Sequence, residues 1–107
     1  CYFCTFQGSI GAMTHCDCNY VPGLLRLGEM DDVAGLIAPR PFCAIAGRED
    51  PIFPIDHARS AFGRLRRTYE VAGVPERCSL YEGDGGHRYY KGGAWPFIRR
   101  HFDTAAV

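Results

Sequence analysis

The sequence predicts an α/β fold built on a parallel sheet of about three strands. Three short apolar runs, each followed closely by a glycine, alternate along the chain with stretches that have helical periodicity. Such alternation implies right-handed crossovers between parallel strands, with helices flanking the sheet. Hydrophobic residues make up 47% and charged residues 22% of the 107 residues, which indicates one small globular domain.

The predicted strands cover residues 2–6, 41–46 and 78–81. The second run is nearly continuous in apolar residues, as expected of a strand that is covered on both faces. Pro39 and Pro41 favour an extended entry into it. A sheet of three strands leaves an apolar edge open, so we expect the chain to be part of a larger domain or to have a partner at that edge.

The clearest predicted helix spans residues 56–72. Its apolar residues recur at spacings of three and four and form one stripe. The members of that stripe are Ala58, Phe62, Leu65, Tyr69 and Ala72. Asp56 is the expected N-cap, and Gly73 followed by Pro75 is the expected stop.

Shorter helices are expected on either side of this one. The first lies within residues 20–30, and a further turn capped by Asp31 or Asp32 follows it. The residues expected on the buried side of the first are Leu24, Leu25 and Leu27. A last helix is expected over residues 94–102. Its expected apolar side consists of Ala94, Trp95, Ile98 and Phe102.

The charge balance argues against two classes of partner. The formal net charge is zero, so nothing suggests binding to nucleic acid or to an anionic membrane surface. No apolar run approaches the roughly 20 residues that a membrane span needs. The six cysteines leave the compartment undecided, because Cys43 and Cys78 lie inside apolar runs and the other four cluster near the N-terminus.

Two residues that follow neighbouring predicted strands carry the chemical argument. Ligands of open α/β sheets bind at the carboxyl ends of the strands. Asp50 follows the second run and His87 follows the third, in a glycine-rich loop. A carboxylate and an imidazole form the pair that activates a hydroxyl, because the histidine takes the proton and the carboxylate orients the histidine.

Taken alone, either residue has a simpler interpretation. An Asp-Pro pair after a strand is often only a turn, and a histidine in a glycine-rich loop often only faces solvent. Their occurrence together at successive strand ends favours a functional pair. Glu49 and Asp84 are competing carboxylates, and Asp50 ranks first because of the pattern Gly-x-x-Asp-x-x-Phe-Pro.

These residues carry a resemblance to a known family. Residues 47–54 resemble the acid loop of α/β-hydrolases of the dienelactone hydrolase and acetyl xylan esterase type, and Gly86-His87 resembles their histidine loop. Residues 32–41, Asp-Val-Ala-Gly-Leu-Ile-Ala-Pro-Arg-Pro, and residues 15–23 resemble segments of the acetyl-xylan-esterase-like members. The resemblance covers essentially the whole chain.

The resemblance implies that residues 1–107 are the C-terminal portion of an α/β-hydrolase domain, in a serine esterase that needs no cofactor. Asp50 and His87 would be its catalytic acid and base. The implied substrate is a small-molecule or carbohydrate ester. Three aromatic residues near the histidine loop either line its pocket or pack internally: Tyr89, Tyr90 and Trp95.

The nucleophile of that family is missing from this sequence. Family members carry it on a Gly-x-Ser-x-Gly elbow. Ser9, Ser60 and Ser79 all lack glycines at that spacing, and Ser9 in Gly8-Ser9-Ile10-Gly11 comes nearest. We therefore expect the elbow in an N-terminal remainder of the domain, and we expect this chain alone not to run the triad mechanism.

A different class of protein competes with this interpretation. Soft ligands cluster near the N-terminus, which suggests a small binding module stapled by a metal or by a disulfide. They are Cys1, Cys4, His15, Cys16 and Cys18. The Cys-x-Cys spacing is tighter than usual for zinc. Cys4 lies in the predicted strand and Cys1 directly precedes it, and residues three apart in a strand point to opposite faces. A non-catalytic pseudoenzyme domain is the third alternative.

Overall fold

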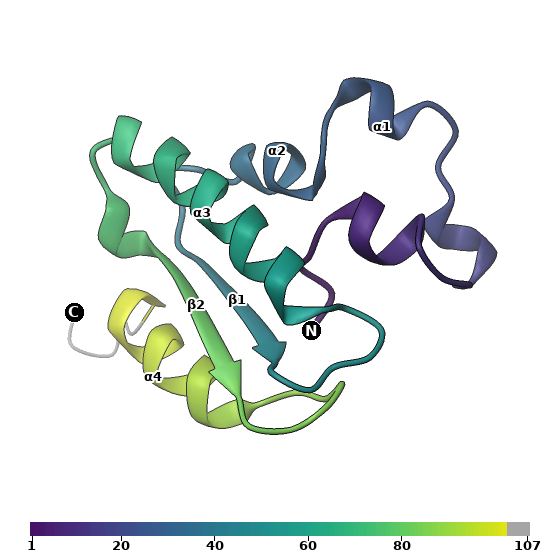
Figure 1. The fold of residues 1–107 in the computed structure, drawn as a ribbon. Helices are drawn as coiled ribbons and strands as arrows, with labels where there is room; N and C mark the ends of the chain where they lie inside the picture. The colour runs from purple at the N-terminus through teal and green to yellow at the C-terminus, as the bar shows by residue number, and fades with distance from the viewer. Residues whose placement is uncertain (103–107) are drawn as a thin grey trace.

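The computed structural model describes residues 1–102 and is a mixed α/β fold with a two-stranded parallel sheet and flanking helices (Figure 1). The strands are β1 (Phe42–Gly47) and β2 (Cys78–Gly83). The helices are α1 (Leu24–Leu27), α2 (Met30–Gly35), α3 (Ile55–Val71) and α4 (Lys91–Phe102). A π-helical turn, Phe6–Ile10, and two 3₁₀ turns, Asp17–Asn19 and Pro75–Arg77, complete the elements. Within this described part, no helix is both long and apolar enough to cross a membrane.

Helices cover both faces of the sheet. The side chain of Cys78 in β2 packs in one core cluster with Leu65 and Tyr69 of α3. Tyr81, an odd number of residues further along β2, lies against Gly93 of α4, where a Cβ would overlap the tyrosine ring. Since successive strand residues point to opposite faces, α3 lies on one face and α4 on the other. The carboxyl ends of the two strands meet at one edge, where Gly47 is opposite Gly83 (Figure 1).

The predicted first strand, residues 2–6, is wrong. Residues 1–5 are irregular, and the π-helical turn begins at Phe6. Thr5 caps this turn because its hydroxyl accepts the N–H of Gly8 at 2.9 Å. The Glu29 carboxylate accepts the two preceding backbone donors, the N–H groups of Phe6 at 2.6 Å and Gln7 at 3.0 Å. A strand would offer such donors to a neighbouring strand, so these side-chain acceptors favour the turn and the sheet has two strands rather than three.

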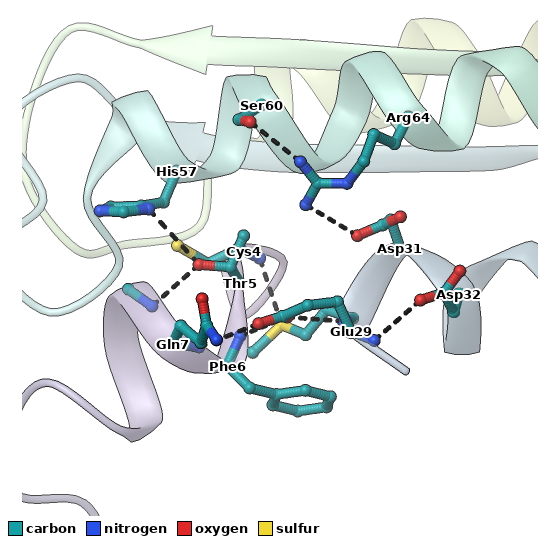
Figure 2. A network of polar contacts seen from close by, with 12 residues as sticks. Cys4, Thr5, Phe6, Gln7, Glu29, Asp31, Asp32, His57, Ser60 and Arg64 are labelled. Atoms are coloured by element: carbon teal, nitrogen blue, oxygen red, sulfur yellow. Dashed lines mark hydrogen bonds and ion pairs between the residues drawn. The ribbon is translucent and has the colours of Figure 1, made fainter. Parts of the chain in front are cut away.

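Figure 2 shows how the same network joins three elements. Glu29 also accepts the N–H of Met30 and is the N-cap of α2, while the Asp32 carboxylate returns a bond to the Glu29 N–H to complete a capping box. Asp31 forms an ion pair with Arg64 of α3 at 3.0 Å. The cap of α2 is therefore Glu29, and the predicted caps, Asp31 and Asp32, lie inside its first turn.

The long predicted helix is confirmed as α3, within one residue at each end. Its stripe is buried most completely at Ala58, Leu65 and Tyr69, each with no exposed surface. Gly73 has a φ of +79°, the left-handed conformation expected of a helix stop. The expected N-cap was wrong, because Pro54 occupies that place without a side-chain bond and Asp56 instead pairs with Arg59.

The apolar faces expected for the shorter helices were partly wrong. In α1, a single turn, Leu25 and Leu27 are 52% and 86% exposed, and only Leu24 packs on the core. Helix α4 begins three residues earlier than expected and buries Ala94 and Phe97. The close contact of Gly93 with the sheet turns these two positions inward, so the other three predicted residues of this side are exposed or half-exposed: Trp95, Ile98 and Phe102.

Candidate catalytic site

Asp50 and His87 lie side by side at the carboxyl ends of β1 and β2. The Nδ1 atom of His87 is 2.7 Å from Oδ2 of Asp50. The Asp50 side chain is 1% exposed, whereas the His87 side chain is 39% exposed. The pair thus combines a carboxylate shielded from water with an imidazole that a substrate can reach.

The loop after β1 holds Asp50 ionised. Its Oδ1 atom accepts the N–H groups of Ile52 at 2.8 Å and Phe53 at 3.0 Å, as in an Asx turn. Burial alone would raise the pKa of Asp50, but the hydrogen bonds from Phe53, His87 and Ile52 outweigh it and leave the pKa below its ordinary value. Asp50 is therefore a carboxylate at neutral pH.

This charge state determines the tautomer of His87. An ionised carboxylate only accepts hydrogen bonds, so Nδ1 of His87 must carry the proton that joins the two residues. The other ring nitrogen, Nε2, then has a free lone pair when the imidazole is neutral. His87 is thus prepared to accept a proton through Nε2, as a general base does.

Backbone contacts join the acid loop to the histidine loop. The N–H of Arg48 donates to the Gly83 carbonyl at 2.9 Å, and the N–H of Glu49 donates to the Gly85 carbonyl at 3.0 Å. Gly47 has to be glycine here, because a Cβ at that position would overlap the carbonyl oxygen of Gly86. The two loops therefore hold one another in register through main-chain atoms.

Phe53 provides a surface on which the His87 ring stacks. The two ring centroids are 5.3 Å apart at an interplanar angle of 24°. Phe53 is itself held by the rings of Tyr2, at 5.1 Å, and His15, at 5.4 Å. The stacked Phe53 ring therefore restricts the orientation of the His87 imidazole.

The competing carboxylates have other surroundings. Asp84 is exposed and forms an ion pair with Arg48 at 2.8 Å. Glu49 is exposed, and its backbone rather than its side chain contacts the histidine loop. Of the three carboxylates weighed from the sequence, it is therefore Asp50 that the structure brings to His87.

None of the three serines, all of them within residues 1–102, has a hydrogen bond to His87. Ser9 is fully buried and donates its hydroxyl proton to the Ile52 carbonyl at 2.6 Å. The Nε2 atom of His15 lies 3.0 Å from the Ser9 Oγ. Because the hydroxyl proton is already donated to Ile52, His15 must be the donor in this second bond. Ser60 accepts from Arg64, and Ser79 contacts a cysteine thiol. Ser9 and His15 thus form a serine–histidine pair separate from Asp50 and His87, but the Ser9 hydroxyl is already hydrogen-bonded and closed to solvent.

The cysteines do not form the cluster that a metal-stapled module requires. All six are free thiols, with Cys4 buried and Cys16 and Cys18 exposed. Among the described residues, no group of three or more histidine, cysteine or acidic side chains is placed to hold a metal ion. Cys43 and Cys78 lie in the strands as predicted, and burial raises the pKa of Cys78 to about 11. The structure thus does not bring the five soft N-terminal ligands together.

Several features of this site were missed from the sequence. The sequence pattern places Phe53 only in the loop after the second predicted strand, whereas in the structure its ring stacks directly on His87. An Asx turn is the signal that could have located it. In such a turn the Asp side chain accepts the backbone N–H groups two and three residues further on, and the chain folds back. Of the aromatic residues expected near the histidine loop, Tyr89 and Trp95 are 60% and 50% exposed, whereas Tyr90 is half-buried against that loop.

No protein-family model, curated protein or solved structure matches this chain.

Proposed function

We propose that this chain is the C-terminal portion of an α/β-hydrolase and supplies the acid and the base of a Ser-Asp-His triad in a carboxylic-ester hydrolase. The observation that carries the proposal is the 2.7 Å hydrogen bond between His87 and Asp50. It joins a buried carboxylate after one parallel strand to an accessible histidine after the next, in the chain order that α/β-hydrolases use. The resemblance of the two loops favours an acetyl-xylan-esterase-like or dienelactone-hydrolase-like enzyme.

The proposed reaction needs a serine from polypeptide outside this chain. His87 Nε2 takes the proton of that serine as its Oγ attacks the ester carbonyl carbon. The tetrahedral intermediate collapses, and the alcohol leaves with the proton that His87 returns to it. Water then attacks the acyl-enzyme with the same assistance from His87, and the carboxylic acid and the free serine are released.

Asp50 has an electrostatic and orienting role in this scheme. It stays ionised while His87 becomes an imidazolium, so the charge that develops on the ring faces an opposite charge 2.7 Å away. Because the carboxylate is almost completely shielded from water, this attraction is screened less than that of a surface pair. The proposal involves no metal or other cofactor.

The test is hydrolysis of p-nitrophenyl acetate by the full polypeptide that carries this chain. We expect His87→Ala and Asp50→Asn each to lower kcat by roughly 1,000- to 10,000-fold, and the double variant to lose little more, because the two residues act as a unit. In Asp50→Asn the amide retains an acceptor for the loop N–H groups but cannot be an anion beside His87.

The matched control is His57→Gln, which changes an exposed histidine near the start of α3 whose ring contacts the Thr5 hydroxyl at 3.5 Å. This variant should keep kcat within about twofold of the unmodified protein. Hydrolysis by Asp50→Asn within tenfold of the unmodified rate would show that the pair does not act as a catalytic acid and base.

A further inference from the structure

The hydroxyl of Tyr90 makes two hydrogen bonds to the backbone just before His87. It accepts the N–H of Gly85 at 3.0 Å and donates to the carbonyl of Gly86 at 2.8 Å. A tyrosine hydroxyl has one proton to donate, and here it goes to the residue next to His87. One side chain therefore fixes two consecutive glycines of the histidine loop.

The ring that carries this hydroxyl is itself well held. It lies against Gly83 at the end of β2, where a Cβ would overlap the ring atoms. The Arg88 guanidinium lies over the ring at 5.0 Å from its centroid, and the Tyr81 ring is 6.4 Å away. The position of the hydroxyl is thus set by β2, through Gly83 and Tyr81, together with Arg88 of the histidine loop.

The same two glycines are held on their other side by the acid loop. The Gly85 carbonyl accepts the N–H of Glu49, and the Gly86 carbonyl lies against the backbone of Gly47. Glycines have the widest choice of backbone conformations, so a pair of them places the next side chain only when outside contacts restrict both. The acid loop restricts these glycines from one side, and the Tyr90 hydroxyl restricts them from the other through its two hydrogen bonds.

We infer that Tyr90 is a positioning residue for His87. Its hydroxyl holds the Gly85–Gly86 backbone so that His87 Nδ1 stays within hydrogen-bond distance of Asp50 and Nε2 keeps a fixed direction. Small displacements of a catalytic group are costly in rate, because the reacting atoms must approach at a defined distance and angle. The consequence for ester hydrolysis rests on the proposed function, whereas the placement of His87 does not.

The test is Tyr90→Phe in the full polypeptide, with two readouts. Loss of the hydroxyl should lower kcat for p-nitrophenyl acetate about 10- to 100-fold and leave KM within about twofold, because the binding surface is unchanged. In proton NMR, the downfield resonance of the His87 Nδ1 proton should broaden and exchange faster with water. A purely structural tyrosine would shift the melting temperature without moving either readout.

The control is Tyr89→Phe, since within the described residues the hydroxyl of this exposed neighbour has no hydrogen-bond partner. It should change neither readout. Gly47→Ala displaces the same backbone from the opposite side, so it should reproduce the kcat loss, and adding Tyr90→Phe to it should cost little more.

An unchanged Nδ1 resonance and an unchanged kcat in Tyr90→Phe would overturn the inference, as would fully additive losses in the double variant. If the unmodified polypeptide hydrolyses no ester, the proposed function fails, but the NMR readout still decides whether Tyr90 positions His87.

Discussion

Asp50 combines almost complete burial with ionisation at neutral pH. Three donors surround its two oxygens: two loop N–H groups and the His87 ring. These bonds offset the desolvation that would otherwise neutralise a buried carboxylate. The residue therefore supports both the shape of the loop and the charge state of the candidate site, and its contribution to stability has to depend on pH.

We predict that this contribution is lost in acid. The pKa of Asp50 in the folded state is lowered from its ordinary value of 3.8. Its stabilising effect is therefore fully present above that value and disappears as the pH falls through the folded-state pKa. Asp50→Asn should lower the free energy of unfolding by about 2 kcal/mol at pH 5 and by clearly less at pH 2.5. Urea unfolding of both proteins across this range measures the difference, and a gap that widens towards low pH would contradict the assigned direction.

For single residues, the sequence could predict the positions of Asp50 and His87 at strand ends, but not which side chains lie next to them. The two residues follow glycine-terminated apolar runs, so a local pattern places both at strand ends. The stacking of Phe53 on His87 and the burial of Ser9 depend on contacts between residues more than 30 positions apart. No local pattern specifies such contacts.

Among the elements, the π-helical turn and α2 are joined by a polar network centred on Glu29. The single carboxylate of Glu29 satisfies N–H groups at the start of both helical elements (Figure 2). The unpaired donors of a helix start carry partial positive charge, so an anion placed between two such starts stabilises both. Phe6, whose N–H donates to Glu29, belongs to the same core cluster as Phe53. The junction therefore also supports the ring on which His87 stacks.

We predict that Glu29→Ala lowers the free energy of unfolding by about 2 kcal/mol, because three backbone donors lose a charged acceptor. The matched control is Glu70→Ala on α3, which removes an exposed ion pair with Arg66 and should cost less than about 0.5 kcal/mol. Thermal unfolding of the two variants makes the comparison. Equal losses in both would mean that the junction does not have the role described.

The elements that the sequence predicted well are those set by local periodicity. α3 has a stripe with helical spacing and a glycine stop, β1 is a nearly continuous apolar run, and β2 is a short strand-like run that ends at a glycine. Residues 2–6 have an equally strand-like composition, but Glu29, more than 20 positions away, takes the backbone donors of Phe6 and Gln7. Strand propensity therefore failed where a distant carboxylate favoured a helical turn.

For the whole molecule, the described residues bring an acid and a base together but place no serine in contact with them. A two-stranded parallel sheet with helices on both faces presents an acid and a base at one edge. The serines of the described chain are buried, bonded elsewhere or within a strand, and none contacts the base. The proposed function therefore requires a serine nucleophile other than Ser9, Ser60 and Ser79, and it requires that this serine react only with His87 in place.

Labelling with a fluorophosphonate tests this claim most directly. A serine activated by a histidine forms a covalent phosphonyl ester with the probe and releases fluoride. In the full polypeptide, we predict one adduct on a serine other than Ser9, Ser60 and Ser79, located by peptide mass spectrometry, and loss of that adduct in His87→Ala. An adduct on one of these three serines, or labelling that persists without His87, would contradict the account.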